Sequence, residues 1–261
     1  MVTYKYFIIF IVFIFFTISF CEKKRKVENW EEVFNKAKYL FDKEKYSRSK
    51  DKFNYLISEN PGTTYSLDAH YYLAKCLMRL KNFDEAIVEF EQYIRLSSKY
   101  DLIEESRYNI CKCYYHLTLN FERDQSKTLD CIEQAQYFLE DYSNSKFNSE
   151  ISSMIFELRK RIAMKDLSTA NLYLKMEEFE SAMIYYNIII DEFYDSGMSD
   201  DARLGILKSY LGRNDIKGAT KYLTLNKPMF FDSLKYLSGN ELIKKHIKNS
   251  EKKSFISRIK F

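Results

Sequence analysis

One spacing of small and large apolar residues recurs along the chain and constrains its fold more than any other feature. Between Leu67 and Ser98, the small residues Ala74 and Ala86 stand where two helices could cross closely. The polar pair Lys81-Asn82 separates them. Large apolar residues flank both alanines at helical spacing, namely Leu73, Leu77, Phe83, Phe90 and Tyr93. The segment therefore predicts a helical hairpin with a closely packed crossing.

The same pattern starts again at four other places. It begins at Trp30, Glu104, Ala163 and Asp200, with small crossing residues Ala37, Ser49, Cys111, Ala135, Ala170, Ala182 and Ala219. The spacing is that of tetratricopeptide repeats, whose hairpins bury their apolar faces only by stacking on neighbours. The chain has only 6 Gly and 2 Pro, too few for the turns of a β-sandwich or an α/β enzyme. We predict an all-α fold, a right-handed superhelical solenoid of five tetratricopeptide-like hairpins.

Two segments depart from the regular pattern. A polar insertion at Thr118–Leu129 predicts a long loop inside the third hairpin, either functional or a tolerated surface insertion. Ser149–Lys175 contains no Gly or Pro and predicts one continuous helix, a spacer between two halves. The predicted divisions are repeats one to three at 29–148, repeats four and five at 149–226, and a C-terminal tail at 227–261. The tail is basic from Ser250 onward, and we expect it to be frayed.

The N-terminus has the features of an export signal. The apolar run Phe7–Phe20 follows Lys5 and is shorter than the ~20 residues of a membrane-spanning helix. It ends at Ile18-Ser19-Phe20-Cys21, which resembles a bacterial lipobox and implies acylation of Cys21. We predict a lipoprotein signal peptide at 1–21, a tether at 22–28, and attachment to the membrane through the lipid. The alternative is an uncleaved N-terminal helix anchor.

Charge and motifs argue against several functional classes. The formal charge is only +4 and both signs are interleaved, which does not suggest a nucleic-acid surface. The sequence has no Gly-rich phosphate loop, GxSxG or HExxH motif. We therefore predict no catalytic residues, no cofactor and no enzyme activity.

The cysteines and histidines favour packing roles. Five Cys form no CxxC pair and only 3 His are present, so we predict no metal site. Cys76, Cys111 and Cys113 fall at small-residue positions of the repeat, where they favour the core. His70 falls at a core position and His116 at a helix end.

A ladder of side chains is predicted on the inner groove of repeats one to three, which share a 37-residue spacing. Positions are counted from the first residue of each repeat, which is Trp30, Leu67 or Glu104. Position 5 holds Phe34, Tyr71 and Tyr108, and position 9 holds Lys38, Lys75 and Lys112. Position 12 holds Phe41, Met78 and Tyr115, with Arg79 next to Met78. The lysines suit a carboxylate, and the aromatic rings suit the apolar side chains of an extended peptide. Coincidence in a Lys- and Tyr-rich chain is the alternative.

The order of these features resembles the BamD family of outer-membrane β-barrel assembly lipoproteins. The resemblance covers roughly residues 17–225 and is most specific in Arg123-Asp124-Gln125, followed by a helix with Ala135. Tyr71-Tyr72-Leu73-Ala74 and Ala170-Asn171-Leu172-Tyr173 also resemble family segments. The departures are Ser143 and Tyr194, near usual prolines, and Tyr185, where many members have Arg.

The resemblance implies a location and partners. It implies lipid anchoring on the periplasmic face of the outer membrane, together with other assembly lipoproteins. The C-terminal repeats would bind a BamA-like outer-membrane protein, with Phe121, Arg123, Asp124 and Gln125 as a partner-binding loop. The N-terminal repeats would bind the C-terminal signal of unfolded barrel proteins. The alternatives are a cell-division or peptidoglycan-linked adaptor and a regulator of an envelope enzyme.

Overall fold

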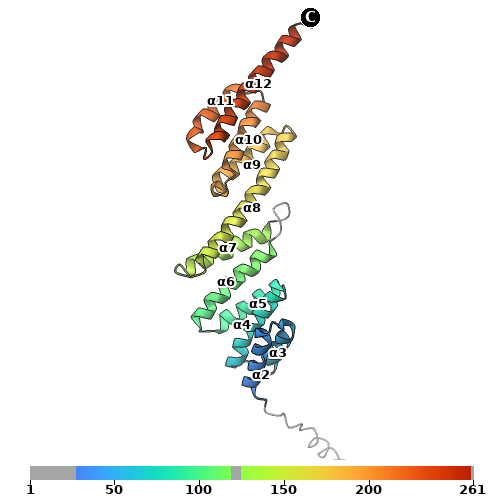
Figure 1. Ribbon diagram of the computed structural model, residues 1–261, viewed down its shortest axis with the longest axis vertical. Helices are drawn as coiled ribbons and strands as arrows, with labels where there is room; N and C mark the ends of the chain where they lie inside the picture. The colour runs from blue at the N-terminus through green and yellow to red at the C-terminus, as the bar shows by residue number, and fades with distance from the viewer. Residues whose placement is uncertain (1–27, 119–124, 260–261) are drawn as a thin grey trace, which may run out of the picture. The chain divides into compact units, whose positions relative to one another are not determined.

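The computed structural model describes residues 28–118 and 125–259, with side chains described up to residue 252. All regular structure in these ranges is helical (Figure 1). The chain divides into two compact units, Met1–Leu96 and Ser97–Phe261, called unit 1 and unit 2 below. Helices adjacent in sequence pack together within each unit, which confirms the prediction of an all-α fold of stacked hairpins.

Unit 1 consists of two hairpins. Helix α2 (Trp30–Asp42) pairs with α3 (Tyr46–Glu59), and α4 (Thr64–Arg79) pairs with α5 (Phe83–Leu96). The predicted crossing residues Ala37, Ala74 and Ala86 are completely buried. Ser49 is buried at the same kind of crossing because its hydroxyl donates to the Ala37 carbonyl at 2.9 Å. Contacts between α3 and α4 join the two hairpins into one core.

The hairpins share one type of turn. The second residue after the helix, which follows the C-cap, has a positive φ of 57–64° at Glu44, Lys81, Glu177 and Asn214. The next N–H then donates back to a carbonyl of the last helical turn, as in Lys45 N to Leu40 O and Asp215 N to Tyr210 O, both 2.9 Å. This Schellman motif satisfies carbonyls that the helix end leaves unpaired. It closes hairpins one, two, four and five.

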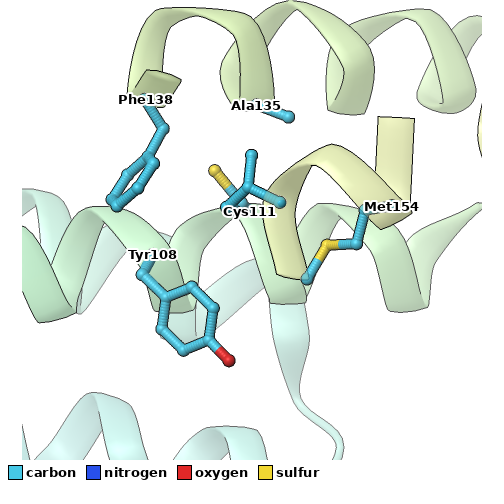
Figure 2. Packing of buried hydrophobic residues seen from close by; sticks show 6 residues of the cluster. Tyr108, Cys111, Ala135, Phe138 and Met154 are labelled. Carbon is cyan, nitrogen blue, oxygen red and sulfur yellow. The ribbon is translucent and has the colours of Figure 1, made fainter. Parts of the chain in front are cut away.

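Unit 2 contains the other three hairpins and a final helix. They are α6 (Tyr100–Leu117) with α7 (Ser126–Asp141), α8 (Asn148–Lys175) with α9 (Phe179–Glu192), α10 (Ser199–Gly212) with α11 (Ile216–Leu225), and then α12 (Ser233–Ile259). Short 3₁₀ turns η1 (Tyr194–Ser196) and η2 (Lys227–Met229) precede α10 and α12. The core of the third hairpin is drawn in Figure 2, where Phe138 and Met154 lie on opposite sides of Cys111.

The continuous helix predicted at Ser149–Lys175 is confirmed by α8, which is 28 residues long. It packs against α7 on one side and α9 on the other, and therefore joins the third and fourth hairpins. Arg159 donates to both carboxylate oxygens of Asp195 at 2.9 and 3.0 Å, and its guanidinium lowers the pKa of that carboxyl. The ion pair fixes η1 against α8.

The predicted divisions differ from the structural ones at two places. The boundary between the compact units falls between Leu96 and Ser97 along the chain, whereas the sequence predicts a division between residues 148 and 149. The physical reason is that α8 packs on helices before and after that point. The predicted loop Thr118–Leu129 is also too long, because α7 already begins at Ser126 and buries Thr128.

The segment 227–261, which the sequence predicts to be a tail, contains the packed helix α12. Helix α12 contacts α10 and α11 and buries Ile243. Gly239 lets the helix approach closely, because a Cβ there would lie 3.0 Å from Leu223 and 3.2 Å from Leu207. The first half of α12 therefore covers the apolar end of the last hairpin.

A buried ion pair holds the segment before α12. Asp200 and Arg203 of α10 pair at 3.0 Å with side chains only 5 and 8% exposed. Asp200 also accepts the N–H groups of Phe231 at 3.0 Å and Asp232 at 2.8 Å. One carboxylate thus fixes both α10 and the start of the final helix, a role that the repeat pattern did not reveal.

Among the helices of the described ranges, none combines the length and apolar character of a membrane span.

Candidate functional site

The predicted ladder in unit 1 lies on α2 and α4, around Tyr72, which is not one of the predicted groove residues. Tyr72 lies 5.8 Å, centroid to centroid, from both Phe34 and Phe41. The Lys38 ammonium lies 5.6 Å from the centre of the same ring. The only sign of Tyr72 in the sequence is its place directly after the predicted groove residue Tyr71. The helices therefore gather Phe34, Lys38 and Phe41 around Tyr72.

On α4, the predicted groove residues include an aromatic ring that contacts a lysine. Tyr71 is only 4% exposed, and Lys75 Nζ donates to its hydroxyl at 3.3 Å. Lys75 Nζ also lies 5.9 Å from the Phe41 ring. Met78 is half-buried and Arg79 is exposed at the end of the same helix. Because Tyr71 is buried, it supports the lysine from below and offers little ring surface to a peptide.

Unit 2 repeats this tyrosine–lysine pair and adds a carboxylate. Lys112 Nζ donates to the Tyr108 hydroxyl at 3.3 Å. Glu150 of α8 accepts the Tyr108 hydroxyl at 2.5 Å and pairs with Lys112 at 3.5 Å. Burial and this carboxylate both raise the pKa of Tyr108. Phe147 stacks on the Tyr108 ring at 4.0 Å. The three polar groups form a closed cluster that ties α6 to α8.

A pocket of about 300 Å³ lies beside that cluster. Its wall includes Lys112, Tyr115 and His116 from α6, and Glu150 and Glu157 from α8. Arg161 fixes the Tyr115 hydroxyl at 3.0 Å. The same guanidinium donates to the Thr118 hydroxyl at 2.9 Å, where α6 ends. The pocket has charges of both signs, so it suits an amphipathic segment better than a simple anion.

Sequence comparisons identify the family. Residues 27–223 match the profile of the outer membrane lipoprotein family YfiO. The chain belongs to this family. It is 25% identical over 199 residues to the outer membrane protein assembly factor BamD of Rickettsia prowazekii (strain Madrid E), covering 75% of this chain and 79% of that protein. It is 23% identical over 218 residues to BamD of Xylella fastidiosa (strain 9a5c), covering 76% and 72%. The resemblance seen in the sequence is therefore confirmed.

The predicted partner-binding loop is only partly described. Phe121, Arg123 and Asp124 lie outside the described residues, as does the predicted acylation site Cys21. Gln125 is 6% exposed, and its side-chain oxygen accepts the Thr128 hydroxyl at 2.7 Å. This contact fixes the first turn of α7. Gln125 therefore has a structural role at the start of α7.

Tyr185, which stands where many BamD-like sequences were expected to have Arg, packs on a neighbouring ring. Tyr185 of α9 stacks on Tyr173 of α8 at 5.5 Å with an interplanar angle of 17°. An aromatic pair of this kind contributes about 0.5–1.5 kcal/mol beyond its buried area.

The histidines occupy packing or surface positions. His70 Nδ1 lies 2.6 Å from Glu89, and the imidazole is only 16% exposed. His246 lies 3.2 Å from the side-chain oxygen of Asn214. No group of three or more metal-ligating side chains is found in the described part of the chain.

The described cysteines are core residues, as the sequence predicts for Cys76, Cys111 and Cys113. Cys76, Cys111, Cys113 and Cys131 are all buried and unbridged. Burial raises the pKa of Cys76 to about 11 and those of Cys111 and Cys131 to about 12. A small, weakly polar thiol fits the helix crossing at Cys111 as an alanine would.

We expect these thiols to resist modification in the folded chain. A pKa near 11 at Cys76 leaves roughly a hundredfold less thiolate than the ordinary value, and burial blocks access as well. The measurement is labelling with a thiol-reactive disulfide, followed by mass analysis of Cys76, Cys111 and Cys131 peptides. The same chain in urea serves as the fully reactive control. Fast labelling of any of these peptides without urea would contradict the burial.

Proposed function

We propose that this chain is a lipid-anchored scaffold on the periplasmic face of the outer membrane, where it takes part in β-barrel protein assembly. The observation that carries the proposal is the family match over residues 27–223, together with two relatives named as outer membrane protein assembly factors. The stacked hairpins support a binding role, since such repeats present extended surfaces to other polypeptides. Acylation of Cys21 would supply the anchor.

A BamA-like outer-membrane protein is the proposed main partner. The support is the resemblance together with the rigid base that unit 2 gives to the connection at 118–125. Arg161 holds Thr118 at one end of this connection, and Thr128 holds Gln125 at the other. Phe121, Arg123 and Asp124 are the proposed contact residues within it.

The proposed second ligand is the C-terminal segment of an unfolded barrel protein. In unit 1, Lys38 and Lys75 extend over aromatic rings, at 5.6 Å from Tyr72 and 5.0 Å from Tyr71. Aromatic rings beneath the ammonium groups hold them in place. A terminal carboxylate would then meet preorganised charges, while Met78 of the same unit supplies apolar contacts.

The test is fluorescence binding of a barrel C-terminal peptide to the detergent-solubilised full chain. Changing Lys38 and Lys75 together to Gln should weaken binding roughly two- to thirtyfold, because exposed ion pairs contribute about 0.2–1 kcal/mol each. Binding to the parent should also weaken with added salt. The matched control changes Lys36 and Lys45, two other exposed lysines of the same unit, to Gln. Equal affinity of the parent and the double groove variant would remove these lysines from the peptide site.

A further inference from the structure

The second half of α12 has a feature that the scaffold function does not use. Helix α12 has 27 residues and is therefore about 40 Å long. Its packing contacts come from the first half, where Tyr236 meets Phe230 and Ile243 is buried. In Figure 1 the last turns of α12 extend beyond the ends of α10 and α11. The final turns are thus presented to the surroundings.

One face of this protruding segment is basic. Lys244, Lys245, Lys248 and Lys252 are all exposed. At 3.6 residues per turn they fall within an arc of about 100°. The arc lies opposite the side on which Gly239 and Ile243 pack against the last hairpin.

Among the described residues, no carboxylate pairs with these four lysines. Lys235, in contrast, pairs with Asp201 at 2.9 Å. From Glu241 to Phe261 the sequence has 7 Lys and Arg against 2 Glu. The positive charge therefore accumulates at this end and is available to an anionic ligand.

We propose that the basic face of α12 binds the anionic phospholipid surface of the membrane to which the lipoprotein is attached. This inference rests on the proposed lipid anchoring, which attaches the chain to a membrane surface, and the family to which the chain belongs is one of outer membrane lipoproteins. A cluster of lysines on one helix face is the feature that anionic headgroups attract, at about a fivefold gain in affinity for each lysine. The sequence after Lys252 also includes Phe255, Ile256 and Ile259, residue types found in interfacial helices. Such a contact would orient unit 2 toward the membrane independently of the acyl anchor.

The experiment uses the full acylated chain with a single reporter. Asn249 is exposed on α12, and the described native cysteines are buried, so Asn249→Cys can be labelled with an environment-sensitive fluorophore. The labelled chain is reconstituted into phosphatidylcholine vesicles with or without phosphatidylglycerol. The proposal predicts a blue shift and brightening only in the anionic vesicles, reversed by high salt.

Two variants make the result specific. Changing Lys244, Lys245, Lys248 and Lys252 together to Gln should abolish most of the shift in anionic vesicles. The matched control, Lys36, Lys45, Lys208 and Lys221 changed to Gln, removes the same charge from exposed positions elsewhere and should keep it. An identical signal in neutral and anionic vesicles would overturn the proposal, as would equal loss in the control. A signal that requires an added outer-membrane protein in neutral vesicles would also overturn it and assign the face to an acidic protein.

Discussion

Replacing Asp200 with Ala is expected to lower the free energy of unfolding of unit 2 by about 3–5 kcal/mol, because it leaves a buried charge without its partner. The Arg203 side chain is only 8% exposed, and its Nε already has no hydrogen-bond acceptor. The substitution also removes the acceptor of the Phe231 and Asp232 N–H groups. Both the start of α10 and the attachment of α12 should therefore be weakened.

The measurement is urea unfolding followed by circular dichroism, with hydrogen exchange at Phe231 and Asp232 as a local probe. Asp201→Ala is the matched control, because Asp201 is the adjacent carboxylate in an exposed pair with Lys235. That change should cost less than about 1 kcal/mol. If Asp200→Ala and Asp201→Ala have the same small effect, the buried pair does not organise the end of unit 2.

Gly205→Ala should destabilise unit 2 by about 1–3 kcal/mol or more, because an overpacked core must shift. A Cβ at Gly205 would lie 2.2 Å from the Tyr186 ring. That ring cannot move easily, since Tyr186 is completely buried and its hydroxyl donates to Asn171 at 2.7 Å. The glycine is therefore required by the close approach of α10 to α9.

Thermal unfolding of the variant tests this close approach. Gly205→Ala would otherwise raise helix propensity by about 1 kcal/mol, so any loss of stability is due to the clash. Lys208→Ala, an exposed change in the same helix, is the control and should leave the midpoint nearly unchanged. A higher midpoint for Gly205→Ala than for the parent would show that α9 and α10 are not packed as described.

The sequence predicts the hairpins well because their signal is local. Ala74, Ala86, Ala170 and Ala182 combine helical spacing with small size, and all four are completely buried. The same spacing cannot identify α12, because α12 does not belong to a two-helix repeat. Its first half packs against the last hairpin through Gly239 and Ile243. Contacts made across long sequence distances, such as Asp200 to Asp232, leave no periodic trace.

The groove residues show a second limit of the repeat pattern. Lys75 and Lys112 each lie next to the tyrosine four residues earlier on the same helix, Tyr71 and Tyr108. The repeat pattern predicted rows of lysines and rings across the repeats and did not predict these contacts within one helix. It did not indicate how far the rings are buried, because burial depends on neighbouring helices. Glu150, which closes the Tyr108–Lys112 cluster, comes from α8 and lies 42 residues from Tyr108 in sequence. Such a carboxylate can be recognised only once α8 is placed against α6.

Purification of the affinity-tagged full chain from bacterial membranes in mild detergent tests the central claim most directly. The account predicts that a BamA-like outer-membrane protein is recovered as a major bound chain, identified by mass spectrometry. An untagged strain gives the background. Recovery of only cell-division or peptidoglycan-linked proteins, or of an envelope enzyme, with no barrel-assembly protein above that background, would contradict the proposed role.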